Sequence, residues 1–243
     1  MREKTEILGV EIDKVNMDEA AAMLAEYLEM DMCSMVFTPN SEILLDAVKE
    51  REFEGILSSG QLVVPDGIGV VIASRFYGTP LKERVAGYDL MLRLMETADS
   101  QGRSIYLFGG KEGVAEEAAI KLTERYGGLR IAGTRNGYFE DDEEGKIIED
   151  INNRKADILL VALGAPKQEK FIYKHKEELK VKIAMGVGGS LDVLAGRTKR
   201  APVFYQKAGL EWFYRLIKEP RRIMRIMRLP KFLALAFVDA IFR

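Results

Sequence analysis

Asp66 is the residue of this sequence whose type and position best suit proton transfer. It lies between Pro65 and Gly67, directly after the apolar run Leu62-Val63-Val64. A carboxylate at the mouth of an apolar cleft can act as a general base and take a proton from a hydroxyl group. Turns also favour Asp for its local hydrogen bonds, so a purely structural role is the alternative.

Four further polar residues predict recognition of a phosphate-bearing ligand. Arg84 supplies a cation, and Thr38, Asn40 and Gln168 supply neutral hydrogen-bonding groups. A guanidinium with several such groups is the set that a polar, phosphate-bearing substrate requires. Taken singly, each of the four is equally compatible with a structural role.

Gly109 and Gly110 form a first glycine-rich turn, between an apolar run and a helical pattern. Backbone amides at the start of a helix favour an anion, so this turn is a candidate phosphate cradle. Phe108 occupies the position where the dinucleotide-binding fingerprint needs its first glycine, which argues against a nicotinamide-dependent oxidoreductase. A plain tight turn is the alternative.

A second glycine-rich turn contains Gly186, Gly188 and Gly189 and leads into Asp192. Missing Cβ atoms allow a ligand to approach the backbone closely, which favours binding at this turn. Asp192 falls in the first turn of the helix that follows, where a carboxylate also interacts well with the helix dipole. Ligand contact and helix stabilisation are therefore both open for Asp192.

No metal ion or other cofactor is expected. The one histidine, His175, lies in a charged run typical of a solvated helix face, and the acidic run 140–144 is typical of a solvated helix start. The one cysteine, Cys33, excludes a disulfide framework and a cysteine-based zinc cluster. The sequence also lacks an Asp-x-Asp motif.

Strands that alternate with amphipathic helices are predicted through residues 1–195. This alternation favours an α/β fold: a Rossmann-like, mostly parallel sheet flanked by helices. Ligands of such sheets bind beyond the carboxyl ends of the strands, where the candidate residues above are found. The predicted strands cover residues 5–10, 34–37, 62–64, 104–108, 129–134, 157–163 and 182–185.

The charge distribution divides the chain into two regions. The 243 residues are 47% hydrophobic and 30% charged, an ordinary globular composition, and the net charge is −2. Residues 196–243 carry 12 Lys and Arg against 3 Asp and Glu, whereas residues 1–195 carry 24 against 35. We therefore expect an acidic α/β catalytic body over 1–195 and a helical, basic appendage over 196–243.

The appendage combines cations with apolar residues. The apolar run 232–240 is too short to cross a bilayer but suits its interface, so we expect an anionic membrane surface or a phosphate ligand as the partner. A solvated face packed on the body is the alternative. The acidic body disfavours nucleic acid, and the charged first residues lack the apolar run of a signal peptide, which predicts a cytoplasmic location. The cations share one helical face: Lys218, Arg221, Arg222, Arg225 and Arg228.

A series of short blocks follows in order along nearly the whole chain. The blocks include Thr38-Pro39-Asn40-Ser41-Glu42, Pro65-Asp66-Gly67-x-Gly69-Val70, Arg84-Val85-x-Gly87-x-Asp89-Leu90, Leu107-Phe108-Gly109-Gly110, Leu163-Gly164-x-Pro166-x-Gln168-Glu169, Gly186-Val187-Gly188-Gly189-x-x-Asp192, Arg200-Ala201-Pro202, Gly209-Leu210-Glu211-Trp212-x-x-Arg215-Leu216 and Glu219-Pro220-x-Arg222-x-x-Arg225. Together they resemble the TagA/WecG/CpsF glycosyltransferase family.

This resemblance implies an inverting, metal-independent transferase on the cytoplasmic face of a bacterial membrane. In one branch of the family, N-acetylmannosamine moves from UDP-N-acetylmannosamine to the 4-hydroxyl of N-acetylglucosamine on undecaprenyl diphosphate. UDP is released, in an early step of wall teichoic acid synthesis. The alternatives are transfer of another UDP sugar to a different lipid-linked acceptor, and a noncatalytic nucleotide-binding protein at the membrane surface.

The resemblance also implies roles for individual residues. Asp66 would be the base that deprotonates the acceptor hydroxyl, and Asp192 with the turn 186–189 would meet the nucleotide. Apolar residues of the appendage would need cover away from a membrane, so we expect an oligomer in solution. The sugar and diphosphate pocket would be lined by Thr38, Asn40, Arg84 and Gln168, and closed by Arg215, Arg222 and Arg225.

Overall fold

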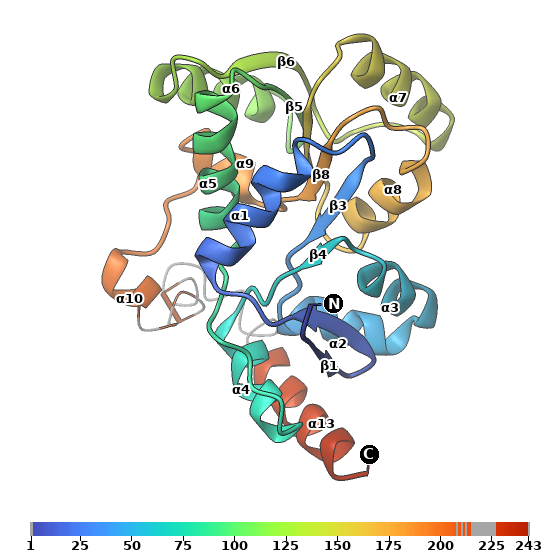
Figure 1. Ribbon diagram of the computed structural model, residues 1–243, viewed down its shortest axis with the longest axis vertical. Helices are drawn as coiled ribbons and strands as arrows, with labels where there is room; N and C mark the ends of the chain where they lie inside the picture. The colour runs from blue at the N-terminus through green and yellow to red at the C-terminus, as the bar shows by residue number, and fades with distance from the viewer. Residues whose placement is uncertain (1, 208, 210, 212, 215–226, 243) are drawn as a thin grey trace.

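A parallel β-sheet forms the centre of the protein. The computed structural model describes residues 2–207, 209, 211, 213–214 and 227–242. The main sheet has six strands in the order β4-β3-β8-β7-β5-β6, and all neighbouring strands run parallel. Helices cover both of its faces (Figure 1), so the predicted α/β fold is confirmed. The strands are β3 (Ser34–Phe37), β4 (Leu62–Val63), β5 (Ser104–Gly109), β6 (Arg130–Arg135), β7 (Ile158–Ala162) and β8 (Ile183–Gly186).

Strand residues alternate between two hydrophobic cores, because successive side chains of a strand point to opposite faces. In β5, Tyr106 and Phe108 belong to one core, and Ile105 and Leu107 belong to the other. Every residue of β3, β4, β5, β7 and β8 is buried, whereas β6 is a partly exposed edge. Burial on both faces explains why these strands have continuous apolar sequences.

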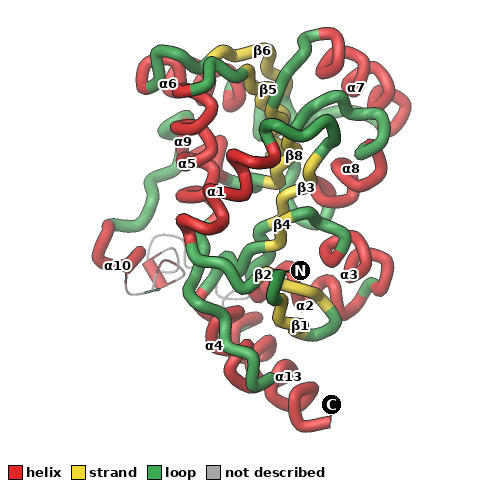
Figure 2. Tube along the Cα trace, viewed as in Figure 1, coloured by secondary structure: helices red, strands yellow, loops and turns green. Residues whose placement is uncertain are grey.

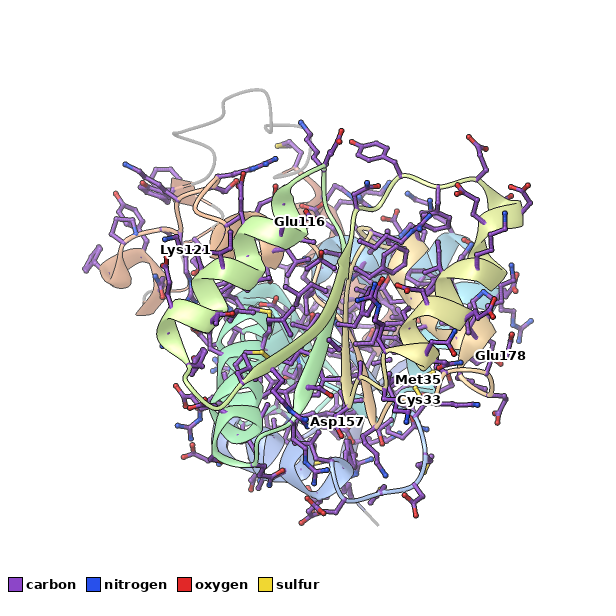
Figure 3. All side chains as sticks on the ribbon, turned by 90° about the horizontal axis from the view of Figure 1, so that it is seen from above. Cys33, Met35, Glu116, Lys121, Asp157 and Glu178 are labelled. Carbon is purple, nitrogen blue, oxygen red and sulfur yellow. The ribbon has the colours of Figure 1, made fainter. Side chains whose placement is uncertain are left out.

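The helices divide between the two faces of the sheet. Seen from above in Figure 3, Glu116 and Lys121 of one helix lie on one side, and Glu178 lies on the other. The first face is covered by α1 (Met17–Tyr27), α5 (Gly87–Ser100), α6 (Val114–Arg125) and α9 (Ser190–Leu194). The second face is covered by α2 (Ser41–Lys49), α3 (Arg51–Ser58), α7 (Glu144–Asn153), which a 3₁₀ turn over Asp141–Glu143 precedes, and α8 (Lys167–His175).

The connections between the parallel strands share one hand. Where the next strand lies closer to β6, the connection crosses the face that carries α5 and α6. Where the next strand lies closer to β4, the connection crosses the face that carries α3, α7 and α8. This is the arrangement that the right-handed crossover rule requires. The chain that follows β3 enters α2 on one face of the sheet, and the chain that follows its neighbour β8 enters α9 on the other face. Ligands of such sheets bind where two neighbouring strands diverge in this way.

An antiparallel hairpin lies beside the main sheet, next to α3 (Figure 2). It consists of β1 (Lys4–Ile7) and β2 (Val10–Asp13). The sequence predicted a single strand over residues 5–10, which is wrong: Leu8 and Gly9 have φ values of +50° and +86° and reverse the chain. The hairpin covers the edge strand β4, which explains why that strand is buried.

Two helices at the lower end in Figure 1 pack side by side, although they are far apart in the sequence. They are α4 (Ile68–Phe76) and the last helix, α13 (Arg228–Phe242). A short helix, α10 (Val203–Lys207), lies between α9 and α13 along the chain. No helix in the described ranges is both long enough and apolar enough to cross a membrane.

The last helix is anchored on the body by apolar and polar contacts. Phe232 is fully buried in the core shared with α2 and α4. The rings of Phe76 and Phe237 meet edge to face, with their centroids 5.5 Å apart, and the Tyr77 hydroxyl donates to the Asp239 carboxylate at 2.8 Å. Part of the predicted appendage therefore belongs to the hydrophobic core of the body.

Candidate active site

The loops that follow the parallel strands gather at one edge of the sheet. Figure 3 shows this edge beside Glu116, at the opposite end of the sheet from Asp157 and Cys33, which precede strands β7 and β3. Every candidate of the body except Arg84 and Asp192 lies at or just after a carboxyl end: Thr38 and Asn40 for β3, Asp66 for β4, Gly109 and Gly110 for β5, Gln168 for β7, and Gly186, Gly188 and Gly189 for β8.

Asp66 is held where the loops of two strands meet the segment before α5. Its backbone N–H donates to the Pro39 carbonyl at 3.1 Å, and the Pro65 carbonyl accepts the Val85 N–H at 3.0 Å. The Gly87 N–H donates to the Asp66 carboxylate. The Asp66 side chain keeps 28% of its surface exposed, so this carboxylate is oriented by the protein and still reaches solvent.

Arg84 lies between two carboxylates. Its Nη2 donates to Asp66 Oδ1 at 3.4 Å and to Glu211 Oε2 at 2.6 Å. Burial raises the pKa of Asp66; the Arg84 charge and the Gly87 N–H oppose this rise, and the Glu211 charge adds to it. A carboxylate with a raised pKa is a stronger base. The structure therefore brings together two predicted site residues, Asp66 and Arg84, in an arrangement that can accept a proton.

Arg200 extends this network of charges. Its Nη1 and Nη2 bind the two Asp89 carboxylate oxygens at 2.6 Å each, and its Nε donates to Glu211 at 3.4 Å. The guanidinium also lies over the Tyr88 ring, 4.7 Å from the centroid. Sequence reasoning did not single out Glu211, Arg200 or Asp89 as site residues; their presence in the family-like blocks was the only signal. The side chains alternate in sign in the order Asp66, Arg84, Glu211, Arg200 and Asp89.

Thr38 and Asn40 border the Asp66 loop. Thr38 packs against Gly87, where an added Cβ would lie 2.8 Å from the Thr38 hydroxyl oxygen. Asn40 is the N-cap of α2, and its Oδ1 accepts the Glu42 and Ile43 N–H groups at 2.9 and 3.1 Å. The Asn40 oxygen therefore serves the helix, and the amide nitrogen is the part of this side chain left for the predicted ligand contact.

Gln168 links the start of α8 to the glycine turn after β8. Its side chain is almost fully buried, and its Oε1 accepts the Gly188 N–H at 3.0 Å. Gly186 leaves room for the Gln168 amide, because an added Cβ would lie 2.9 Å from Nε2. Gly188 has a φ of +50°, a conformation that glycine adopts easily. The structure thus joins Gln168, Gly186 and Gly188, with Gln168 holding the backbone of the turn.

Glu169 is a buried carboxyl group that sequence reasoning missed. It is 1% exposed, and within the described part of the chain its Oε2 has no hydrogen-bond partner. Burial raises the pKa of Glu169. Its Oε1 accepts from Gln168 Nε2 at 2.8 Å, which sets the orientation of the Gln168 amide. The pattern of charges in this helix gave no sign that Glu169 faces inward.

Gly109 and Gly110 form a tight turn with positive φ values of +125° and +73°. A Cβ on Gly109 would overlap the Ala162 carbonyl, and the Gly110 N–H donates to that same carbonyl at 2.9 Å. The tight-turn alternative therefore accounts for both glycines. Because the Gly110 amide is engaged within the protein, contact of this turn with a phosphate stays a prediction.

Asp192 lies in the first turn of α9, as predicted, and Gly189 is the N-cap of that helix. The Asp192 carbonyl accepts the Thr198 N–H at 3.0 Å. Among the described residues, no hydrogen bond joins this turn to the pair of Asp66 and Arg84; the two groups share only the same edge of the sheet. The three predicted tail arginines, Arg215, Arg222 and Arg225, lie outside the described residues.

His175 does not lie on a solvated helix face, so that prediction is wrong. The residue is 6% exposed, and its Nε2 and Nδ1 lie 2.9 and 3.0 Å from carboxylate oxygens of Glu144 and Glu178. Its ring also packs on Phe171. The charged residues around His175 in the sequence hid its inward position. In the described part of the chain, no cluster of three or more His, Cys, Asp or Glu residues could hold a metal ion.

Comparison with known proteins relates this chain to a family of transferases. A relative from Bacillus spizizenii is 38% identical over 206 residues, which cover 85% of this chain and 79% of the relative. A relative from Staphylococcus aureus (strain MRSA252) is 33% identical over 232 residues, which cover 95% and 91% of the two chains. Both are named N-acetylglucosaminyldiphosphoundecaprenol N-acetyl-beta-D-mannosaminyltransferase. The family model described as "Glycosyl transferase WecG/TagA/CpsF family" matches residues 5–243, and this chain therefore belongs to that family.

Proposed function

We propose that this protein is an inverting glycosyltransferase in which Asp66 is the general base. The observation that carries the proposal is a partly exposed carboxylate with a raised pKa, oriented by the Gly87 N–H and in contact with Arg84. Such a group can take the proton of an acceptor hydroxyl. The hydroxyl oxygen then bonds to the anomeric carbon of the donor sugar as the bond to the diphosphate breaks, which inverts the configuration at that carbon.

The donor that we propose is UDP-N-acetylmannosamine, and the acceptor is the 4-hydroxyl of N-acetylglucosamine on undecaprenyl diphosphate. The names of the Bacillus and Staphylococcus relatives support the transferred sugar and the lipid-linked acceptor. The uridine diphosphate carrier follows from the family resemblance. The reaction would release UDP and supply an intermediate of wall teichoic acid synthesis.

The leaving UDP gains negative charge, and we propose that cations of the protein stabilise it without a metal ion. Arg84 suits this role, because within the described residues its Nε is buried and lacks a hydrogen-bond partner. Thr38 and Asn40 would line the sugar pocket, and Gln168 with the turn 186–189 and Asp192 would meet the nucleotide. Arg215, Arg222 and Arg225 would hold the diphosphate from the other side.

We further propose that residues 1–195 are the catalytic body and that residues 196–243 hold the protein on the cytoplasmic face of the membrane. Both α4 and α13 expose apolar side chains, and the sequence that directly precedes α13 is rich in Arg. This combination suits the interface of an anionic bilayer, and the same surface could support an oligomer in solution. The apolar residues are Ile72, Phe76, Phe237, Val238, Ile241 and Phe242.

One assay tests the proposed reaction directly. The full chain is incubated with a short-chain lipid diphosphate N-acetylglucosamine and, in turn, UDP-N-acetylmannosamine, UDP-N-acetylglucosamine and UDP-glucose, with and without EDTA. We expect UDP release with the first donor only, unchanged by EDTA, and a product whose new linkage is inverted by NMR. Loss of turnover in EDTA would contradict the metal-independent mechanism. Vesicle binding without consumption of any donor would favour a noncatalytic surface protein.

The membrane role has its own test. Flotation with anionic and with neutral vesicles compares the native chain with a variant that carries Ile241→Ser and Phe242→Ser, two exposed positions of α13. We expect binding to anionic vesicles only, and weaker binding by the variant. Sedimentation of both proteins without lipid measures self-association. Equal binding of the two proteins to both kinds of vesicle would refute the assignment of this surface.

A further inference from the structure

Glu211 is the one carboxylate among the described residues beyond position 195 that contacts Arg84. Its Oε2 accepts from Arg84 Nη2 at 2.6 Å, and this same nitrogen lies 3.4 Å from Asp66 Oδ1. Both side chains of the shorter pair are largely buried, with 19% of Arg84 and 14% of Glu211 exposed. One guanidinium nitrogen is thus shared unequally between the proposed base and a residue of the appendage.

The two unequal distances determine how strongly the positive charge of Arg84 stabilises the negative charge of Asp66. A cation paired closely with a carboxylate strongly favours its charged, proton-free form and makes it a poor base. The shorter contact draws Arg84 toward Glu211 and leaves the longer contact to Asp66. Glu211 is itself fixed from its other side by Arg200 Nε at 3.4 Å, and Arg200 is fixed by Asp89.

We propose that Glu211 is a positioning residue of the transfer reaction: by holding the Arg84 guanidinium, it leaves the Asp66 carboxylate free to accept the proton of the acceptor hydroxyl. This inference rests on the proposed function, because it assumes that Asp66 is the base. It gives the C-terminal segment a part in the chemistry that does not depend on membrane binding. The segment supplies the Glu211 carboxylate. Without it, Arg84 would pair closely with Asp66 and weaken Asp66 as a base.

The described charged and polar groups that act on Asp66 come from separate parts of the chain. Arg84 and the Gly87 N–H come from the segment around the start of α5, and Glu211 comes from the appendage. Arg200 and Asp89 lie one and two steps further along the network. Removal of the Glu211 charge should therefore bring Arg84 closer to Asp66 and lower the pKa of Asp66.

Glu211→Gln tests this inference, because it removes the charge and keeps the size of the side chain. The dependence of kcat/KM on pH is measured for the full-length native chain and the variant. We expect the acid limb of the profile to move to lower pH by about half a unit to one unit. The plateau value of kcat should fall several-fold, because a weaker base transfers the proton less well.

Glu117→Gln is the matched control. Glu117 pairs with Arg197 at 2.7 and 2.8 Å, so it also joins the appendage to the body, but through α6 and away from Asp66. This variant should leave both the acid limb and the plateau unchanged. Glu211→Asp, which restores a carboxylate, should move the acid limb back toward the native position.

A readout without catalysis separates this inference from the proposed function. In protein labelled with ¹³C at its aspartate carboxyl groups, the resonance missing from Asp66→Asn identifies Asp66, and its titration midpoint should be lower in Glu211→Gln. An unmoved midpoint and acid limb would overturn the role of Glu211. Full activity of Asp66→Asn would instead overturn the proposed function, even if the midpoint moved. A lower plateau kcat with an unchanged acid limb and an unchanged Asp66 titration midpoint would show that Glu211 has only a structural role, and this too would overturn the inference.

Discussion

Arg200 binds Asp89 through both terminal nitrogens of its guanidinium, with the two distances equal at 2.6 Å. Arg200 belongs to the appendage, and Asp89 lies in the first turn of α5. A two-point contact fixes direction as well as distance, so this pair sets the path of the chain as it leaves the body. The same arginine then reaches Glu211.

Asp89→Asn should loosen this attachment. We expect the free energy of unfolding to fall by about 1 kcal/mol, because the pair is partly exposed. We also expect limited proteolysis to cleave the chain after residue 195 faster than in the native protein. Asp18→Asn is the control, since Asp18 pairs with Arg93 at 2.6 Å on an exposed surface. Equal proteolysis of the two variants would show that the Arg200 contact does not hold the appendage.

Asp66→Asn should abolish most of the turnover and leave the nucleotide site intact. The amide keeps the shape of the carboxylate but cannot accept the acceptor proton, so we expect kcat to fall by about 10²-fold or more. UDP release gives the rate, and calorimetric titration with UDP gives the affinity, which should stay within about twofold of native. Near-native turnover would remove Asp66 from the mechanism.

Glu169→Gln should stabilise the protein increasingly as pH rises. Burial raises the pKa of Glu169 above 4.5 in the folded state. Below pH 4.5 the carboxyl group is protonated in both the folded and the unfolded native protein, and its contribution to the free energy of unfolding is fully present. As pH rises from 4.5 to the folded pKa, the free energy of unfolding falls, because the unfolded chain releases this proton more easily. Within this window the variant should gain about 1.4 kcal/mol per pH unit relative to native protein.

Urea unfolding from pH 4 to pH 8 measures this gain. Glu124→Gln serves as the control, because that side chain is 59% exposed and should show no such trend. A difference between Glu169→Gln and native protein that is the same at every pH would contradict a shifted carboxyl at position 169.

Gly109→Ala should destabilise the fold far more than Gly164→Ala. Both glycines have positive φ, but a Cβ at Gly109 would overlap the Ala162 carbonyl, whereas a Cβ at Gly164 would meet nothing within 4 Å. We expect a loss of about 3 kcal/mol or more at Gly109 and about 1 kcal/mol at Gly164. Urea unfolding checks both values, and similar losses would refute the close approach of β5 to β7.

Phe232→Ala should unfold the protein more easily, because the side chain is fully buried between α13 and the body. The expected cost is about 3–5 kcal/mol. Phe242→Ala, at an 85% exposed position of the same helix, should change stability by no more than about 0.5 kcal/mol.

A chain that ends at Ala195 should keep its sheet but melt at a lower temperature than the native chain. Equal stability of all four proteins would show that α13 does not pack as described.

The sequence alone determined where the chemistry could lie. Apolar runs followed by polar turns marked the strand ends, so the positions of Asp66, Gln168 and the two glycine turns at the carboxyl edge were predictable. The six parallel strands followed from alternation with helices. These features are local, because they depend on the order of residue types within one strand and the turn after it.

Tertiary structure alone decided which of these residues act together. Glu211 reaches Arg84 across 127 positions, and Gln168 reaches Gly188 across 20, and no short-range pattern encodes such pairs. Burial of Glu169 and His175 could not be predicted either. A helix sequence rich in charged residues indicates solvent exposure, and only packing against the sheet determines which of its residues face inward. Contacts between distant segments depend on how the layers pack, and packing is a property of the whole chain.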